Sequence, residues 1–491
     1  MTMGVAGLDD ILNGGLPANR VYLIEGEPGT GKTTIALQFL MEGAKLGESG
    51  LYITLSESKE ELESVARSHD WSLAGFSIYE LIPPADSLKP ESQYTIFHPS
   101  EIELGETTNA VLEQVELVKP KRVVFDSLSE MRLLAGDPLR FRRQILALKQ
   151  YFAGRHSTVL LLDDKVYGAQ DLQVHSIVHG VISLEHLAVE YGAERRRLRI
   201  TKLRGSRFRG GYHDFTIYTG GVTVFPRLVA AEHHNDFKKE SIPTGIKELD
   251  SLLGGGLDRG TATLILGPAG SGKSTLGAQF AAATAARGEL TAAYVFDELK
   301  ETFIARAAGV GTDIRSSIKD DLFRIQQVDP AELSPGQFAH TIRRAVDVHG
   351  AKVVIIDSLN GYLNAMPDER LLTVQMHELL TYLNQKGVAT ILVMAQHGFL
   401  GAAMATPVDI SYLADTVMLL RYFESDGAVH RAISVIKKRS GAHEHTIRPF
   451  EITSNGIRIG KPLSQFRGVL RGVPTYEGTK KSLGEDGDDA T

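Results

Sequence analysis

The sequence predicts an α/β protein with two tandem domains, each built on a largely parallel twisted sheet with helices on both faces. Three observations lead to this prediction: the chain is too long for one core, an internal repeat divides it, and short β-branched runs alternate with helical patterns. At 491 residues, the chain suits two or three domains of ~100–200 residues each.

The internal repeat begins with two glycine-rich strings. Residues 26–34 read GEPGTGKTT and residues 267–275 read GPAGSGKST. The offset between them, 273 − 32 = 241 residues, also aligns residues 4–16 with residues 245–257. The two halves of the chain are therefore homologous copies of one unit.

The repeat and the polar stretches around it predict the domain boundaries. We expect a first domain over residues 1–228 and a second over residues 244–477. The linker between them, residues 229–243, is polar, carries both charge signs and ends at a proline. Residues 478–491 form an acidic tail without apolar periodicity, which we expect to be disordered.

Short apolar runs are the expected strands of the first domain. They cover residues 21–25, 50–55, 122–126 and 158–162. Stretches with apolar residues at 3–4 spacing, such as residues 140–152, separate them and predict helices. Strands that are apolar throughout are buried on both faces, as in a parallel sheet. Extended segments near residues 198–203 and 215–225 predict an antiparallel extension that closes each domain.

Composition excludes several classes of protein. The chain is 43% hydrophobic and 23% charged, as in ordinary globular proteins. Its apolar runs fall short of the ~20 residues of a membrane span, and no basic-then-apolar leader is present, so we expect a cytoplasmic protein without a membrane partner. The absence of cysteine excludes disulfides, thiolate catalysis and cysteine-ligated zinc. The formal charge of −7 argues against a surface built for nucleic acid.

Both glycine-rich strings match G-x-x-x-x-G-K-[ST] between an expected strand and an expected helix. In such loops backbone N–H groups surround the phosphates, the lysine reaches the β- and γ-phosphates, and the hydroxyl binds Mg²⁺. The predicted nucleotide-binding residues are Gly29, Thr30, Gly31, Lys32, Thr33 and Thr34, and Gly270, Ser271, Gly272, Lys273, Ser274 and Thr275. The alternative is a glycine-rich turn without a ligand, but the full match in this context favours ATP and Mg²⁺.

An aspartate ends a later apolar run in each half. Asp126 and Asp357 correspond at an offset of 357 − 126 = 231 residues. At the carboxyl edge of a strand beside the phosphate loop, each is predicted to act with Thr33 or Ser274 at the magnesium site and to orient water. The alternative is an ordinary Asp-Ser cap for the following helix.

Hydrolysis or transfer also needs a carboxylate that orients or deprotonates the attacking oxygen. The end of the second expected strand offers Glu57 in the first half and Asp297 and Glu298 in the second. The two halves differ because Ser56 precedes Glu57. The alternative is a solvated acidic start of a helix, where carboxylates are favoured.

Over nearly its whole length the chain resembles the KaiC family, two-domain RecA-fold ATPases known from the cyanobacterial circadian clock. Besides the two phosphate loops, residues 201–217, 409–423 and 430–452 carry the resemblance. It implies tandem RecA-like domains and a double-ring homohexamer with ATP at subunit interfaces. It further implies a slow ATPase in the first domain, an ATPase with serine/threonine autokinase activity in the second, and a role as a signalling or timing switch with a KaiB-like or other signalling partner. Clock members have a Glu-Glu pair in both domains where this chain has Ser56-Glu57 and Asp297-Glu298.

Basic residues of the late strands fall into spaced pairs. Lys202 and Arg204, like Lys437 and Arg439, are two residues apart, so on a strand each pair projects from one face. The family resemblance implies that these cations contact the ATP of the neighbouring subunit, with Arg431 joining the second set. The alternative is a solvated basic strand edge.

The resemblance also implies phosphorylation sites just before the Ala-Asp-Thr-Val string at residues 414–417. This chain has Ser411 and Tyr412 there, and we expect Ser411 to be used first. An ordinary loop serine is the alternative.

Two other functions share the expected fold. One is a RecA- or helicase-type DNA-dependent ATPase, and the other is a non-kinase scaffold whose nucleotide state sets its conformation. The basic run at residues 194–210 contains Lys202 and Arg204, so a subunit contact accounts for much of it without DNA.

Overall fold

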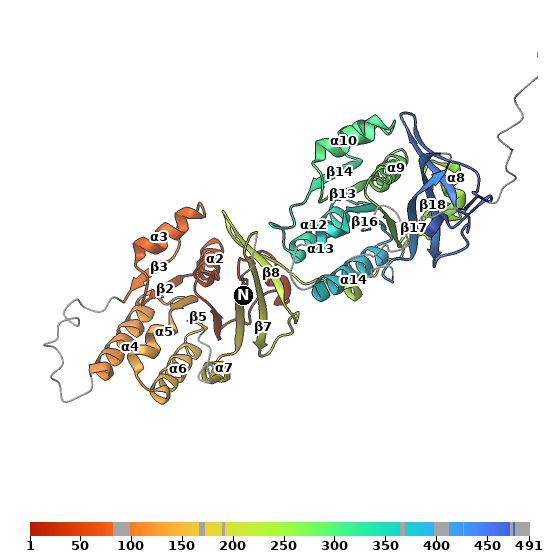
Figure 1. Cartoon of the computed structure of the whole chain (residues 1–491). Helices are drawn as coiled ribbons and strands as arrows, with labels where there is room; N and C mark the ends of the chain where they lie inside the picture. Colours follow the sequence, from red (N-terminus) through yellow and green to blue (C-terminus); the bar gives the residue numbers. More distant parts are fainter. Residues whose placement is uncertain are drawn as a thin grey trace, which may run out of the picture. The chain divides into compact units, whose positions relative to one another are not determined.

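A computed structural model describes residues 1–81, 99–165, 172–188, 192–363, 369–396, 412–425, 427–471 and 475–476 (Figure 1). The chain divides into two compact units, Met1–Arg227 and Leu228–Thr491. The predicted tail at residues 478–491 and the candidate acceptor Ser411 lie outside the described residues.

The first unit contains one nine-stranded sheet in the order β3-β2-β4-β5-β1-β6-β7-β8-β9. Its strands are β1 Val21–Gly26, β2 Gly50–Thr54, β3 Ser77–Glu80, β4 Arg122–Asp126, β5 Thr158–Asp164, β6 Gly180–Leu187, β7 Arg195–Leu203, β8 His213–Tyr218 and β9 Gly221–Phe225. The first six strands in this spatial order, from β3 across to β6, pair in parallel with their neighbours. The strands from β6 across to β9 pair antiparallel. The predicted parallel sheet with an antiparallel extension is confirmed.

The helices of the first unit are α1 Leu8–Ile11, α2 Lys32–Lys45, α3 Lys59–Ser68, α4 Pro99–Val118, α5 Leu128–Ala135, α6 Pro138–Ala153 and α7 Leu172–Ile177. Local sequence sets where some of them begin. Ser58 and Glu61 form a reciprocal capping box at α3, and the Asp137 side chain accepts from backbone N–H groups at the start of α6.

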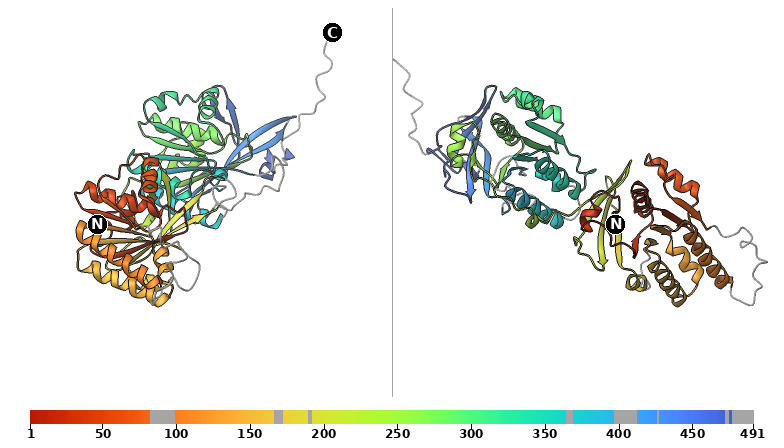
Figure 2. Two further views of the ribbon diagram at one scale, coloured as in Figure 1. Left: turned by 90° about the vertical axis from the view of Figure 1, so that its left-hand side faces the viewer. Right: turned by 180° about the vertical axis from the view of Figure 1, so that it is seen from behind.

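Helices cover both faces of this sheet. Along β1, Tyr22 and Ile24 pack with residues of α2, while Val21 and Leu23 pack with residues of α4, α5 and α6. Figure 1 shows α2 and these three helices on opposite sides of the strands, and the view from behind shows the same two layers (Figure 2). Because burying an unpaired charge is costly, a strand buried on both faces favours charged side chains near its ends rather than in its middle.

The second unit repeats this plan with a sheet in the order β14-β13-β15-β16-β12-β17-β18-β19-β20. Its strands are β10 Ser241–Ile242, β11 Leu257–Asp258, β12 Ala262–Gly267, β13 Thr291–Val295, β14 Phe323–Gln327, β15 Val353–Asp357, β16 Ala389–Ala395, β17 Thr416–Ser425, β18 Ala428–Lys438, β19 Arg448–Thr453, β20 Gly456–Ile459, β21 Phe466–Arg467 and β22 Thr475–Tyr476. Its helices are α8 Lys247–Leu253, α9 Lys273–Ala285, α10 Lys300–Gly309, α11 Arg315–Lys319, α12 Pro335–Asp347, α13 Leu359–Leu363 and α14 Glu369–Gln385, with short 3₁₀ turns η3 Ala230–Glu232 and η4 Val469–Arg471. The predicted fold class, two tandem α/β domains, is confirmed.

The segment for which we predict a linker contacts the second unit at its start. Ala230 is buried in the core of that unit, and its N–H donates to the Glu378 carboxylate on α14 at 3.1 Å. The His233 ring packs edge-to-face on Tyr382 at 5.2 Å between centroids. The first residues after Arg227 are thus fixed to α14.

A buried arginine ties three segments of the first unit together. Arg122, at the start of β4, is 1% exposed. Its guanidinium bonds to the Glu48 carboxylate at 2.7 Å and to the carbonyls of Phe39 and Thr2 at 2.8 and 2.7 Å. Three acceptors thus depend on one side chain.

We predict that Arg122→Ala lowers the free energy of unfolding of the first unit by about 3–5 kcal/mol, because it leaves a carboxylate and two carbonyls without their donor. Urea titration followed by the fluorescence of Trp71, the single tryptophan of the chain, measures the first unit by itself. Arg155→Ala is the matched control, because its surface pair with Glu116 is worth less than about 1 kcal/mol. Equal losses in the two variants would contradict the prediction.

Candidate active sites

Both glycine-rich strings form the turn between the central strand and the next helix. Gly29 and Gly31 have φ angles of 79° and 96°, and the equivalent Gly270 and Gly272 have 73° and 102°. Side chains rarely tolerate this left-handed backbone, which explains the glycines. Helices α2 and α9 begin at the lysine of each motif, so their N-terminal N–H groups point to the place where phosphates would bind.

In the second unit this turn borders a cavity of about 360 Å³, a size typical of small-molecule sites. The predicted site residues that line it are Gly270, Gly272, Lys273, Ser274, Thr275, Asp297, Glu298 and Asp357. Ser271, also predicted to bind nucleotide, is fully buried. The structure therefore brings the predicted lysine, hydroxyl and three carboxylates to one cavity.

Asp357 and Lys273 are oppositely charged groups removed from water in this cavity. Asp357 is 7% exposed, and burial raises its pKa to about 6 although a hydrogen bond from Ser274 opposes the rise. Burial lowers the pKa of Lys273, which Asp357 and Asp297 counteract. The cavity thus holds a carboxylate that lacks a full set of partners.

These residues fit a magnesium ion. The Oδ2 atom of Asp357 is buried without a hydrogen-bond partner among the described residues, and buried oxygens of this kind require one. The Ser274 hydroxyl bonds to the same carboxylate, and both are hard oxygen ligands of the type Mg²⁺ takes. In the described part of the chain no three metal-binding side chains cluster, so the ion would need nucleotide phosphates as further ligands.

Two residues of the second site were missed by the sequence analysis. Arg306, on α10, bonds to the Glu298 carboxylate and lies 3.4 Å from the Thr275 hydroxyl. Ser358 donates to the Asp297 carboxylate. The eight-residue spacing of Glu298 and Arg306, about two helical turns, was the available signal for the first pair.

The first site has the same parts with different partners. The Lys32 ammonium bonds to the carbonyls of Gly26 and Glu27 at 2.8 and 3.0 Å and to the Asp164 carboxylate at 2.8 Å. Asp164 ends β5 and was not predicted. Thr30 and Thr34 are buried, and the Thr30 hydroxyl bonds to the Glu27 carbonyl.

A tyrosine lies between the two predicted magnesium-binding residues of the first site. Tyr52 of β2 is fully buried and donates to Asp126 Oδ2 at 2.5 Å, and Thr33 is hydrogen-bonded to the same hydroxyl. Burial raises the pKa of Asp126, while the bond from Tyr52 and the charge of Lys32 oppose the rise. Strand pairing aligns Tyr52 with Ala293 of the second unit, where this hydroxyl has no equivalent.

Glu57, for which we predict a role at the attacking oxygen, lies beside these groups. Burial and then the charge of Asp126 raise its pKa, while Lys32 opposes the rise. Its Oε2 atom is buried without a hydrogen-bond partner among the described residues. Glu57 can therefore accept a bond from a water or hydroxyl.

The basic pair of the first unit lies where the central parallel strands begin, whereas its phosphate loop lies where they end. Lys202 pairs with Val181 at the start of β6, and the start of β6 adjoins the start of β1, whereas the loop follows the end of β1. The Lys202 ammonium bonds to the Val178 carbonyl at 2.7 Å and to the His175 carbonyl, and Arg204 bonds to the Ser176 carbonyl at 3.4 Å. Neither cation is placed to contact the loop of its own unit.

The second unit shows the same arrangement for Lys437 and Arg439 but not for Arg431. Lys437 bonds to the Ala414 carbonyl at 2.7 Å, and Arg439 bonds to the carbonyl of Tyr412 at 3.0 Å. Arg431 pairs with Tyr422, whose hydroxyl bonds to the Ala269 carbonyl in the phosphate loop. The structure thus separates Arg431 from the other two predicted cations.

Of the two predicted phosphorylation sites, Tyr412 is described and Ser411 is not. The Tyr412 side chain is 52% exposed. Its backbone is fixed by Arg439, one of the predicted cations.

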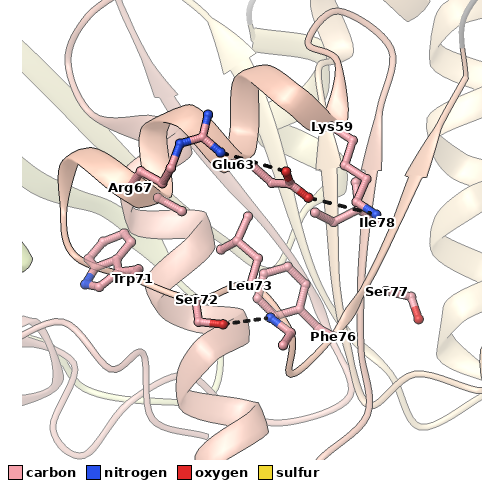
Figure 3. Close-up of a pocket in the computed structure, with 11 residues that line it drawn as sticks. Lys59, Glu63, Arg67, Trp71, Ser72, Leu73, Phe76, Ser77 and Ile78 are labelled. Atoms are coloured by element: carbon pink, nitrogen blue, oxygen red, sulfur yellow. Dashed lines mark hydrogen bonds and ion pairs between the residues drawn. The ribbon is translucent and has the colours of Figure 1, made fainter.

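A larger cavity of about 620 Å³ lies between α3 and β3 of the first unit (Figure 3). Trp71, Leu73 and Phe76 form its apolar lining, and Glu63 pairs with Lys59 and Arg67 along its rim at 4.0 Å. It shares no lining residue with the phosphate loop, so it is distinct from the predicted site.

Comparison with known proteins agrees with this geometry. The sequence model of the KaiC ATPase family matches residues 1–229 and again residues 242–464. The chain belongs to this family. It is 28% identical to the circadian clock protein KaiC3 of Synechocystis sp., over 96% of this chain and 94% of that protein. It is 26% identical to the circadian clock oscillator protein KaiC of Synechococcus elongatus, over 96% and 91%.

Membership of the KaiC family makes both units ATPase domains, and the RecA-like fold predicted from the sequence is confirmed with it. The two matches correspond to the two phosphate-loop sites described above. Among the described helices, none has the length and apolar character to cross a membrane.

We predict that Asp357→Asn stabilises the second unit by at most about 3 kcal/mol, the equivalent of the difference between pKa 3.8 and about 6. A carboxyl whose pKa is higher in the folded chain disfavours folding when ionised. The gain is therefore full above pH about 6 and fades as the pH falls toward 3.8.

Urea titration of the nucleotide-free chain by far-ultraviolet circular dichroism, at neutral and acidic pH, tests this prediction. Asp126→Asn is the matched variant in the first unit, with a smaller gain because Tyr52 already bonds to that carboxylate. A loss of stability in Asp357→Asn at neutral pH would contradict the prediction.

Proposed function

We propose that this protein is a KaiC-like ATP-hydrolysing and autophosphorylating serine/threonine kinase that acts as a hexameric signalling or timing switch. The observation that carries the proposal is the cavity of the second unit, which Lys273, Ser274 and three carboxylates line together. The family supports the ATPase activity. The kinase activity, the hexamer and the use of Mg²⁺ are our inference.

In the proposed reaction the chain supplies binding, orientation and a proton acceptor. The backbone of the phosphate loop and Lys273 hold the phosphates, while Ser274 and Asp357 would hold a magnesium ion, which would supply positive charge to neutralise the phosphates. Asp297 or Glu298 orients the attacking oxygen and accepts its proton. Lys32, Thr33, Asp126 and Glu57 have the equivalent roles in the first unit.

The basic pairs would complete each site from a neighbouring subunit. Lys202 and Arg204 lie across the sheet from their own phosphate loop, and Lys437 and Arg439 do so in the second unit, so contact with another subunit's ATP is the role their position favours. A cation donated in this way stabilises the charge that develops on the phosphoryl group. Activity then depends on assembly.

Ser411 is the proposed acceptor, with Tyr412 as the second candidate. Transfer joins the acceptor oxygen to the γ-phosphorus, breaks the bond to the β-phosphate oxygen, and passes the acceptor's proton to a carboxylate. A cytoplasmic location and a KaiB-like or other signalling partner complete the proposal. A DNA-dependent ATPase and a non-kinase scaffold are the alternatives that the experiments below exclude or favour.

We predict that Lys273→Ala abolishes autophosphorylation while hydrolysis by the first site remains measurable, because each lysine serves one phosphate loop. Lys32→Ala is the matched variant and should keep autophosphorylation. ATP hydrolysis assays and mass spectrometry of phosphopeptides on the purified chain measure both activities.

Equal loss of both activities in either variant would contradict separate sites. An active ATPase without phosphate on Ser411 or Tyr412 would favour the scaffold. Hydrolysis stimulated by DNA would favour the DNA-dependent ATPase.

We predict that the chain sediments as a hexamer when ATP and Mg²⁺ are present, because the basic pairs are proposed to act on a neighbouring subunit. A monomer at micromolar concentration with saturating nucleotide would contradict the proposed assembly.

We predict that Lys202→Ala/Arg204→Ala lowers the rate of ATP hydrolysis at the first site by about 10³-fold, as loss of a trans-acting cation does. Lys238→Ala/Lys239→Ala removes the same charge elsewhere and should leave that rate unchanged.

A further inference from the structure

All three donors of the first phosphate-loop lysine are engaged within its own unit. An ammonium has three N–H donors, and those of Lys32 bond to two loop carbonyls and to the Asp164 carboxylate. The Lys32 side chain is 10% exposed and that of Asp164 is 40% exposed. A phosphate can bond to this ammonium only if one of these acceptors gives way.

Asp164 is held in place by its surroundings. Its backbone N–H donates to the Ser129 hydroxyl at 3.2 Å, and that hydroxyl is 3.4 Å from Asp164 Oδ2. The preceding Asp163 is buried and bonds to Ser129 and Arg132. The end of β5 is therefore anchored, and the carboxylate is directed toward the phosphate loop.

The second unit has a methyl group where the first has this carboxylate. Strand pairing places Asp164 beside Gly26 and Ala395 beside Gly267, and Ala395 lines the cavity of the second site. Among the described contacts, Lys273 bonds to the Pro268 carbonyl at 2.8 Å and pairs with no carboxylate at hydrogen-bond distance. A carboxylate therefore competes with phosphate for Lys32, whereas none of the described contacts of Lys273 is with a carboxylate at hydrogen-bond distance.

We propose that Asp164 competes with nucleotide phosphates for Lys32 and thereby lowers the affinity of the first site for ATP below that of the second site. The inference rests on the proposed function. The inference extends that function by assigning the order in which the sites bind nucleotide: as the concentration of ATP rises, the second site fills before the first.

The physical basis is electrostatic. Binding of ATP at the first site breaks the Lys32–Asp164 pair and leaves a carboxylate beside the polyphosphate, where like charges repel. Solvent at Asp164 reduces this cost. We therefore expect a difference of at least about tenfold in affinity rather than loss of binding.

The test isolates each site with a variant of the other. In a Lys273→Ala chain, Asp164→Asn removes the charge and keeps the side-chain shape, and we expect it to tighten binding of a fluorescent ATP analogue with Mg²⁺ by about tenfold or more. Asp10→Asn, on the exposed side of α1, removes the same charge away from the loop and should leave the dissociation constant unchanged.

The reciprocal change is made at the second site. In a Lys32→Ala chain, Ala395→Asp should weaken binding about tenfold or more, while Ala395→Asn controls for size. Trp71 fluorescence in urea verifies that the first-unit variants remain folded. Loss of fold cannot produce the tighter binding expected of Asp164→Asn.

The outcomes separate the two proposals. Binding in the Lys273→Ala chain that Asp164→Asn leaves unchanged or weakens overturns the role of Asp164 alone. If neither the Lys273→Ala chain nor its Asp164→Asn derivative binds the analogue, the first unit is not a nucleotide site, and both proposals fail for it.

Discussion

The burial of the central strands on both faces is the constraint on which the rest of each unit depends. Strand β1 is apolar toward both helix layers, so charged groups are admitted only where a strand ends. In a parallel sheet the ends of neighbouring strands meet at one edge. The phosphate loop, Asp126 and Glu57 of the first unit are neighbours for this reason, although the chain separates Glu57 from Asp126 by 69 residues (126 − 57).

The two units use this edge differently. In the second, Asp357 and Lys273 are both buried, and Asp357 Oδ2 has no hydrogen-bond partner among the described residues. In the first, Tyr52 bonds to the aspartate and Asp164 to the lysine, so the same groups are satisfied from within. Buried charges are costly unless they are paired. The second unit therefore keeps an unpaired buried carboxylate oxygen at its site, whereas in the first unit the corresponding aspartate and lysine are both paired.

The sequence predicted most of the polar residues that line the second cavity, because the spacing of the phosphate loop and the carboxylates after strands follows from local structure. It also predicted the sheet with its antiparallel extension. Strand β6 and edge strand β3 were not predicted, since β3 is short and half-exposed. Tyr52, Asp164 and Arg306 were missed as well. Each is an ordinary residue of a strand or helix, and only tertiary contacts show what it bonds to.

In each unit the basic pair lies where the central strands begin, and the phosphate loop lies where they end. An interface that brings the basic pair of one subunit to the phosphate loop of another is therefore heterologous, because it uses two different patches of each subunit. Such an interface gives every subunit the same direction and repeats until it closes into a cycle or extends as a filament. If both units formed interfaces of this kind, their repeats would have to agree in copy number, because the two units are joined in one chain. A mismatch in rotation between the two sets of interfaces would give an open spiral instead of a ring.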